Sequence, residues 1–253
     1  MASMLAAPLV PHVFVIPAYN EERNLPRLLA DFETRPSLFP AGSRIVIVDD
    51  GSQDDTCAIV ERYDGSLPVE LVRLGRNQGP GAAFRAGFAE ALASCPGDAL
   101  IITLEADTTS DLDALPAMIA RAHAGVDLVL ASWVMIKVSR VRRTLSEGSA
   151  MFVRAALGVD ATTVSSFFRV YRAGLLKAAF EHYGEDFIRE PGFACKAEVL
   201  AKVAALGARI EEVPVDLDSS RREGRSNMPI VKTTYTYWRM CARMRLAREA
   251  HAA

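Results

Sequence analysis

Several features that mark other protein classes are scarce or missing in this chain of 253 residues. Its four cysteines, at positions 57, 95, 195 and 241, form no CxxC pair, which excludes a zinc ribbon and a disulfide-stapled secreted domain. No apolar run reaches the roughly 18 residues of a membrane span, and no signal peptide pattern opens the chain. The 29 lysines and arginines are balanced by 31 acidic residues, so the positive excess of a nucleic-acid-binding protein is absent. We therefore expect a cytoplasmic globular protein that does not bind nucleic acid.

Short apolar runs alternate with stretches of helical periodicity along the chain. The expected strands cover 13–16, 45–48, 69–74, 99–104, 128–134, 167–171 and 210–215. Runs that are apolar throughout are typical of strands buried on both faces, which favours an α/β fold whose mostly parallel central sheet carries helices on both faces. We expect one continuous domain over 13–226, preceded by a tail at 1–12 and followed by a basic amphipathic helix at 227–253.

Polar residues follow the first four expected strands at the points where the strands end. They are Tyr19, Asn20 and Glu21, then Asp49 and Asp50, then Arg76 and Asn77, then Glu105 and Asp107. Because ligands of parallel α/β sheets bind at the carboxyl ends of the strands, these groups are expected to share one rim.

Two short strings at this rim can carry chemistry. The carboxylates of Glu105 and Asp107 lie two residues apart, so both can reach one hard divalent cation that also takes phosphate oxygens. The alternative is that they cap the following helix. Asp49-Asp50-Gly51-Ser52 has a similar alternative as a plain Asp-Gly turn.

The glycines at 79 and 81 do not complete a dinucleotide fingerprint, since Phe84 stands where GxGxxG needs its last glycine. Together with Arg76 they predict a loop that lets backbone and guanidinium approach phosphate, with a plain glycine turn as the alternative.

Two basic segments lie further along. Arg142 and Ser146 are one helical turn apart and can clamp a phosphate, or they lie on a solvated basic face. The stretch 232–248 holds five basic residues, no acidic one and several aromatics. Such a helix can lie on an anionic membrane, or pack its apolar stripe on the domain or on a partner.

Taken in order, several strings match a known family. VIPAYNEERN, IVDDGSQDDT, RLGRNQGPGAAFRAGF and LEAD resemble the successive nucleotide-sugar-binding motifs of inverting family 2 glycosyltransferases, and of their dolichyl- or polyprenyl-phosphate mannosyltransferase and glucosyltransferase branch in particular. SSFFRVYR, GFACKAEV and VPVDLDSSRREGRSNM resemble the second half of that branch. The resemblance implies a glycosyltransferase A-type fold that moves a hexose, mannose or glucose, from a GDP- or UDP-sugar to a lipid phosphate.

The resemblance also implies roles for individual residues. The expected donor nucleotide site consists of Pro17, Tyr19, Glu21, Asp49, Asp50, Arg76 and Gly79, with Asp49 receiving the base or ribose and Asp50 shaping the turn. Glu105, Asp107 and Thr109 would hold Mg²⁺ or Mn²⁺ on the diphosphate. Arg221 would reach the diphosphate from a mobile loop and act with Asp107 in catalysis. Arg142 and Ser146 would bind the acceptor's phosphate, and Glu198 matches an acidic family position.

Departures from the family pattern gather on the acceptor side. Phe167 stands where glycine is usual, Trp133 where arginine is expected, and Glu147 follows Ser146 in place of arginine. On the donor side Glu105 replaces an aspartate and Thr109 a glutamine. The donor half of the site is thus expected to be intact, while the acceptor is less closely specified.

Three functions follow from this pattern. A lipid-phosphate transferase would work peripherally at the inner face of the membrane, through its basic aromatic tail or through a separate membrane subunit. A transferase to a soluble hydroxyl would need a base, for which Glu190 or Asp186 is the candidate. A nucleotide-sugar-binding protein that has lost catalysis is the third.

Overall fold

The computed structural model of the protein describes residues 10–134, 151, 154, 158, 161–164, 166–216, 221–223 and 230–252. Its strands are β1 (His12–Ala18), β2 (Arg44–Asp49), β3 (Val69–Arg73), β4 (Leu100–Thr103), β5 (Leu128–Val134), β6 (Arg169–Arg172) and β7 (Ile210–Asp216). Its helices are α1 (Leu25–Glu33), α2 (Thr56–Glu61), α3 (Pro80–Ala93), α4 (Leu115–His123), α6 (Ala173–Tyr183), α7 (Cys195–Ala205) and α8 (Ile230–Ala252). Short 3₁₀ turns are η1 (Pro36–Leu38), η2 (Leu112–Ala114) and η3 (Gly184–Ile188).

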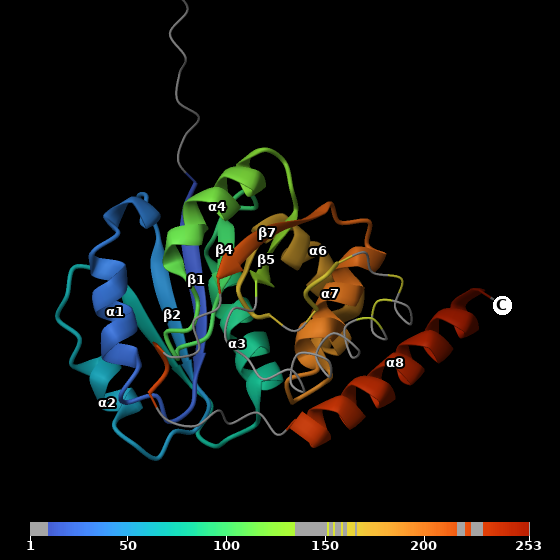
Figure 1. The fold of residues 1–253 in the computed structure, drawn as a ribbon, viewed down its shortest axis with the longest axis horizontal. Coiled ribbons are helices and arrows are strands. Elements are labelled where there is room, and N and C mark those ends of the chain that lie inside the picture. The colour runs from blue at the N-terminus through green and yellow to red at the C-terminus, as the bar shows by residue number, and fades with distance from the viewer. Residues whose placement is uncertain are drawn as a thin grey trace, which may run out of the picture.

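The strands form one seven-stranded sheet in the order β3-β2-β1-β4-β6-β5-β7 (Figure 1). The neighbours β3-β2, β2-β1, β1-β4 and β5-β7 are parallel, whereas β6 runs antiparallel to both β4 and β5. The predicted mostly parallel sheet is therefore confirmed. The carboxyl ends of β1, β2, β3 and β4 lie at one edge, where the polar strings follow.

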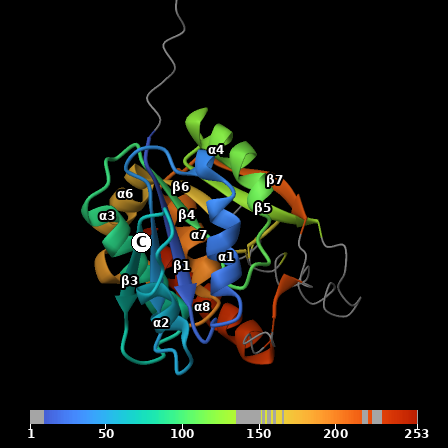
Figure 2. The same cartoon turned by 90° about the vertical axis from the view of Figure 1, so that its left-hand side faces the viewer.

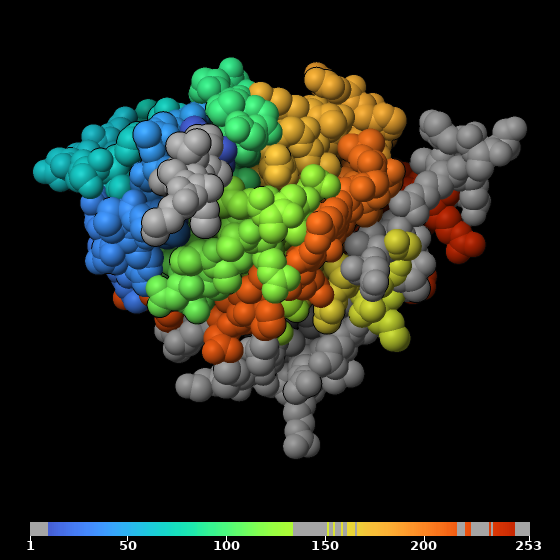
Figure 3. All heavy atoms as spheres, turned by 90° about the horizontal axis from the view of Figure 1, so that it is seen from above, coloured from blue at the N-terminus to red at the C-terminus, as the bar shows by residue number. Residues whose placement is uncertain are grey.

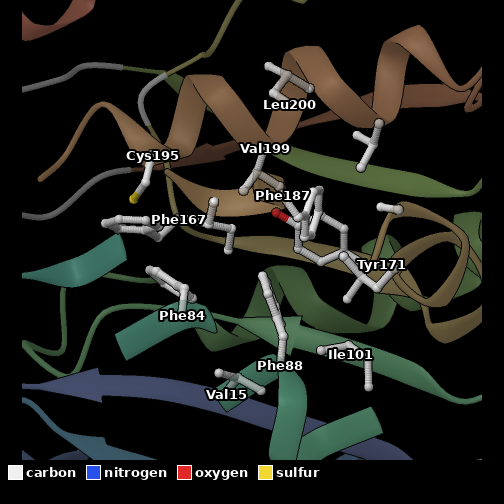
Figure 4. Packing of buried hydrophobic residues seen from close by; sticks show 14 of the residues in the cluster. Val15, Phe84, Phe88, Ile101, Phe167, Tyr171, Phe187, Cys195, Val199 and Leu200 are labelled. Carbon is white, nitrogen blue, oxygen red and sulfur yellow. The ribbon is translucent and has the colours of Figure 1, made fainter. Parts of the chain in front are cut away.

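Two hydrophobic cores lie on opposite faces of the sheet. Alternate residues of β1 enter different cores, because successive strand side chains point to opposite faces. Phe14 belongs to the first core, with residues of α1 and α4, and Val15 to the second core, with residues of α3, α6 and α7. Figure 2 shows α1 on one side of the strands and α3 and α6 on the other. Figure 4 shows the second core around Phe84, Phe88 and Tyr171. Both faces are covered, as the apolar strands predict.

Helix α3 lies unusually close to the sheet. A Cβ atom added at Gly87 would lie 2.4 Å from Val15 Cγ1 and 2.9 Å from Val48 Cγ2, so a side chain there would collide with the strands. This approach fixes the start of α3, with Gly79 and Gly81, beside the loop that follows β2.

The basic C-terminal helix α8 packs against the second core next to α7 (Figure 1). Tyr237, Met240 and Cys241 are buried on one side of α8, whereas Tyr235 and Trp238 are 68% and 61% exposed on the other. Of the alternatives for this segment, packing of one apolar stripe on the domain is what the structure shows. No helix within the described ranges combines the length and apolar character of a membrane span.

The end of the sheet at which β1 begins faces away from the polar strings. There α4 and β7 lie side by side on the surface (Figure 3).

Candidate active site

The loops that follow β1 and β2 are joined by hydrogen bonds at the rim of the sheet. The backbone N–H of Asn20 donates to Ser52 Oγ at 2.9 Å, and that of Glu21 donates to Thr56 Oγ1 at 2.8 Å. The Glu21 carboxylate accepts a hydrogen bond of 2.7 Å from Asn24 Nδ2, while desolvation raises its pKa. Pro17, near the end of β1, and Tyr19, directly after that strand, are half-buried. The predicted donor residues of the first two loops are thus neighbours in space.

Asp49 and Asp50 face different loops. Asp49 stabilises the turn that follows it, since its carboxylate accepts hydrogen bonds from the backbone N–H groups of Gly51 at 3.2 Å and Ser52 at 3.1 Å. Asp50 accepts from Gln78 N at 2.7 Å and Gly79 N at 2.8 Å, and burial raises its pKa. The turn-shaping role expected of Asp50 therefore belongs to Asp49 in this structure, and Asp50 fixes the glycine loop.

The glycine loop is packed against a second segment of the chain. A Cβ atom at Gly81 would lie 1.9 Å from the carbonyl oxygen of Glu190, and one at Gly79 would lie 2.4 Å from that of Pro191. Gly81 N donates to the Pro191 carbonyl at 2.8 Å. The close approach that these glycines permit in the structure is to backbone, and the approach of this loop to phosphate stays a prediction. Arg76 is exposed on the same loop.

The predicted metal-binding residues Glu105, Asp107 and Thr109 lie in the loop after β4, where Asp107 and Thr109 contact each other. Asp107 Oδ1 accepts from the backbone N–H of Thr109 at 3.1 Å and from its hydroxyl at 2.6 Å. Its Oδ2 forms an ion pair with Arg222, and Asp107 is only 2% exposed. Thr108, which lies between Asp107 and Thr109, has a φ of 62°, an uncommon value for a non-glycine residue. Its hydroxyl supports this conformation by donating a hydrogen bond of 2.9 Å to the Arg221 carbonyl.

Glu105 has a lysine partner that sequence reasoning missed. Glu105 Oε1 lies 3.7 Å from Lys196 Nζ, and Oε2 accepts from Ser110 Oγ at 3.4 Å. Lys196 belongs to α7 and is 7% exposed, and this burial lowers its pKa. Its ammonium lies 3.9 Å from the centroid of the Phe167 ring and 5.3 Å from that of Phe193. The string GFACKAEV holds this lysine, but nothing in its local pattern indicates a partner in the loop after β4.

The segment 221–223 contacts both α1 and Asp107. Arg221 Nη2 pairs with Asp31 Oδ2 on α1 at 2.7 Å, so the side chain expected at the diphosphate is held on the helix. Its neighbour Arg222 is the residue that reaches the acidic motif. Asn24 fixes the segment further, because it donates to the Glu223 carbonyl at 3.1 Å and accepts from Glu223 N at 2.9 Å.

Two buried carboxylates lie beneath α8. Glu198, fully buried, accepts from Lys202 Nζ at 2.8 Å and Arg243 Nη2 at 3.0 Å. Glu190, 1% exposed, lies 2.8 Å from Arg243 Nη1 and 3.5 Å from Arg239 Nη2. Within the described ranges neither of its oxygens has a well-aligned hydrogen bond. Glu190 is therefore enclosed by arginines, whereas Asp186, the other candidate base, is exposed and paired with Arg189 at 3.2 Å.

The predicted acceptor residues Arg142 and Ser146 lie outside the described residues. Of the acceptor-side departures, Phe167 is buried against Phe84, with ring centroids 4.2 Å apart, and Trp133 is half-buried.

The acidic motif fits a divalent cation that takes most of its ligands from a substrate. No group of three or more histidine, cysteine, aspartate and glutamate side chains gathers in the described part of the chain, so a cage of protein ligands is not formed there. Asp107 Oδ2 nevertheless already faces a cation, the Arg222 guanidinium. A carboxylate in this position can bind Mg²⁺ or Mn²⁺ whose other ligands are diphosphate oxygens and water.

The seven-stranded sheet, in which only β6 is antiparallel to its neighbours, has the glycosyltransferase A-type fold that solved structures of this class share. The chain belongs to the glycosyl transferase family 2, whose model matches residues 13–184. The resemblance seen in the sequence is thereby confirmed at the level of the family.

Curated relatives carry the name undecaprenyl-phosphate 4-deoxy-4-formamido-L-arabinose transferase. The protein from Pseudomonas fluorescens strain Pf-5 is 36% identical over 168 residues, which is 65% of this chain and 48% of that protein. The protein from Pseudomonas aeruginosa strain PAO1 is 35% identical over 167 residues. The chain spans about half the length of the curated relatives it matches.

Solved structures share the fold at lower identity. Mannosyl-3-phosphoglycerate synthase from Rubrobacter xylanophilus has a TM-score of 0.65 at 19% identity, covering 96% of this chain and 75% of its own. Glucosyl-3-phosphoglycerate synthase from Mycobacterium tuberculosis, solved with Mn²⁺, UDP-glucose and phosphoglyceric acid, has a TM-score of 0.63 at 17% identity over 92% of this chain and 80% of its own. TarS of S. aureus with UDP-GlcNAc has a TM-score of 0.60 at 20% identity over 92% and 65%.

Proposed function

We propose that this protein transfers a sugar from a nucleoside-diphosphate sugar to a polyprenyl phosphate in one inverting displacement. The observation that carries the donor half is Asp107, a buried carboxylate at the rim of the sheet with one oxygen facing an arginine. The names of the curated relatives support a polyprenyl phosphate acceptor. The finer proposal is a hexose, mannose or glucose, carried on GDP or UDP.

The donor site supplies charge neutralisation for the leaving diphosphate. Arg222 already lies at the acidic motif, on a segment anchored to α1 through Arg221 and Glu223. Positive charge at the developing anion is the main stabilisation that such a transfer requires. A divalent ion at Asp107 would add Lewis-acid stabilisation of the same oxygens.

The enclosure of Glu190 supports a phosphate rather than a hydroxyl acceptor. An alcohol must lose a proton in the reaction and needs a base within hydrogen-bond reach, but Glu190 is buried behind Arg243 and Arg239. A phosphate monoester is already ionised at neutral pH, so it attacks the anomeric carbon without a protein base.

We also propose that α8 places the protein at the surface of an anionic membrane. Tyr235, Trp238, Arg239, Ala242 and Arg245 are all exposed on α8. Their spacing of three or four residues puts them on one side of the helix, opposite the buried Tyr237 side. Aromatic rings at the headgroup level, joined to arginines, are typical of helices that lie on anionic lipids.

The first experiment on the donor is a calorimetric titration of GDP, UDP and NAD with and without Mn²⁺. We expect Mn²⁺-dependent binding of GDP or UDP, no binding of NAD, and loss of the metal dependence in Asp107→Asn. Transfer is then followed into undecaprenyl phosphate in detergent, with radiolabelled GDP-mannose, UDP-glucose and the UDP-linked formamido-arabinose in parallel. Product on a soluble alcohol but not on the lipid would overturn the acceptor proposal.

Membrane binding is tested separately by sedimentation with vesicles. We expect binding to phosphatidylglycerol vesicles, little to phosphatidylcholine vesicles, and loss of binding in the double variant Tyr235→Ser/Trp238→Ser. Ala242→Ser, on the same exposed side, is the matched control. Equal sedimentation of the double variant and the wild-type protein would refute the role of α8, and failure of the wild-type protein to bind would favour recruitment by a membrane subunit.

A further inference from the structure

The acidic motif contains four carboxylate oxygens, and the structure engages them unequally. Asp107 Oδ1 accepts two hydrogen bonds from Thr109, and Glu105 Oε2 accepts one from Ser110. Glu105 Oε1 faces Lys196, and Asp107 Oδ2 faces Arg222. Each carboxylate is therefore already paired with a cation of the chain, one from α7 and one from the segment 221–223.

These two cations differ in how firmly they are held. The side chain of Arg222 is 27% exposed on a short segment that returns over α1. That of Lys196 is 8% exposed, and its ammonium lies over the Phe167 ring at 3.9 Å, within the range of a cation–π contact. Phe167 is itself packed against Phe84. A metal ion can displace the arginine, but the lysine is fixed by the core beneath it.

We propose that Lys196 is the permanent counter-cation of Glu105, a positioning residue that leaves Asp107 as the principal carboxylate ligand and lowers the affinity of the motif for divalent cations. The inference rests on the proposed function, because it assumes that Asp107 is the metal ligand. Its physical basis is that the Lys196 ammonium pairs with the Glu105 carboxylate and repels a cation that approaches the same motif.

The consequence is an asymmetry between two carboxylates that look equivalent in the sequence. Loss of the Asp107 charge should remove metal binding, whereas loss of the Glu105 charge should weaken it less, because it removes the neutralisation of Lys196 and not a metal ligand. Removal of the lysine should free Glu105 and remove the repulsion. At the effective dielectric constant of partly buried sites, this is expected to tighten Mn²⁺ binding by about tenfold.

The test measures bound Mn²⁺ by electron paramagnetic resonance, with and without UDP, and needs no turnover. We expect about tenfold tighter binding in Lys196→Met, near wild-type binding in Lys196→Arg, and less than about threefold weakening in Glu105→Gln. In the Glu105→Gln background, Lys196→Met should still tighten binding, because it removes the repulsion, but by less than in the wild-type background, because no carboxylate is released.

Thermal unfolding of each variant separates loss of folding from loss of binding, and Glu105→Gln tests the asymmetry even if Lys196→Met does not fold. Unchanged or weaker Mn²⁺ binding in a folded Lys196→Met, or equal losses in Glu105→Gln and Asp107→Asn, would overturn the inference alone. If the wild-type protein binds no Mn²⁺, or Asp107→Asn binds it equally well, the metal part of the proposed function fails and the inference fails with it.

Discussion

The arginine by which α8 contacts the two buried carboxylates gives a prediction whose size can be worked out from the structure. Arg243 contacts Glu190 at 2.8 Å and Glu198 at 3.0 Å, and both carboxylates are at most 1% exposed. Arg243→Met keeps much of the apolar stem but removes the charge. Glu198 retains Lys202 at 2.8 Å, whereas Glu190 is left facing Arg239 at 3.5 Å.

Removing one partner of a buried ion pair costs about 3–5 kcal/mol, because the other charge stays in a poorly solvated position. The Arg243 side chain is 36% exposed, so water screens part of the interaction. We therefore expect a loss of about 2–3 kcal/mol in the free energy of unfolding, or roughly 5–10 °C in Tm for a chain of this size.

Urea and thermal unfolding followed by circular dichroism measure this loss. Arg239→Met is the matched control, since its side chain is 60% exposed, and it should cost less than about 1 kcal/mol. The double variant Glu190→Gln/Arg243→Met should recover at least half of the loss. Equal stability of Arg243→Met and the wild-type protein would refute the view that Glu190 depends on α8 for its charge balance.

Three further predictions concern the site and the core. Gly81→Ala places a methyl group 1.9 Å from the Glu190 carbonyl oxygen, so we expect lower Tm and weaker UDP binding by calorimetry; wild-type values for both would contradict the packing. Arg222→Met removes the cation that faces Asp107 Oδ2, so bound Mn²⁺ should increase several-fold in a resonance titration, and a decrease would show that the arginine does not compete with metal. Burial lowers the pKa of His12 below 6.5, so the unfolded state takes up the proton at a higher pH than the folded state does. The contribution of neutral His12 to the free energy of unfolding is therefore complete above pH 6.5 and is lost as the pH falls below it. His12→Gln should reduce this loss between about pH 7 and pH 5 in urea unfolding, and an unchanged pH profile would exclude His12 as its source.

Most of the sheet could be predicted because its strands are buried on both faces. An apolar run that is too short for a helix favours a buried strand. The runs 13–16 and 45–48 accordingly fall within β1 and β2. The position of β6 between β4 and β5 could not be predicted from the sequence, because strand order depends on pairing between distant segments. Which side of α8 packs on the domain could not be predicted from the sequence either, since aromatic residues lie on both sides of this helix.

The site shows the same division between local and distant information. The acidic motif after β4 consists of residues close in sequence, and so does the turn that Asp49 forms with Gly51 and Ser52. Lys196 and Glu105 meet only through tertiary packing, so the lysine carried no local signal. Arg221 and Arg222 are adjacent, and which of them turns toward α1 is decided by Asp31, a residue far away in the chain.

The hydrogen bonds between Asn24 and Glu223 join residues that are 199 positions apart. During synthesis the first strands and α1 leave the ribosome long before their partners in the segment 221–223, and contacts of such high sequence separation form late. Until then Asp31 lacks Arg221 and Asp107 lacks Arg222. Ribosome-arrested chains that end before residue 221 should therefore remain more sensitive to protease at α1 than chains that end after residue 223. The pairing of Asp107 with Arg222 therefore forms only after residues 221–223 have been synthesised, so a chain that stops before them carries the acidic motif without this arginine.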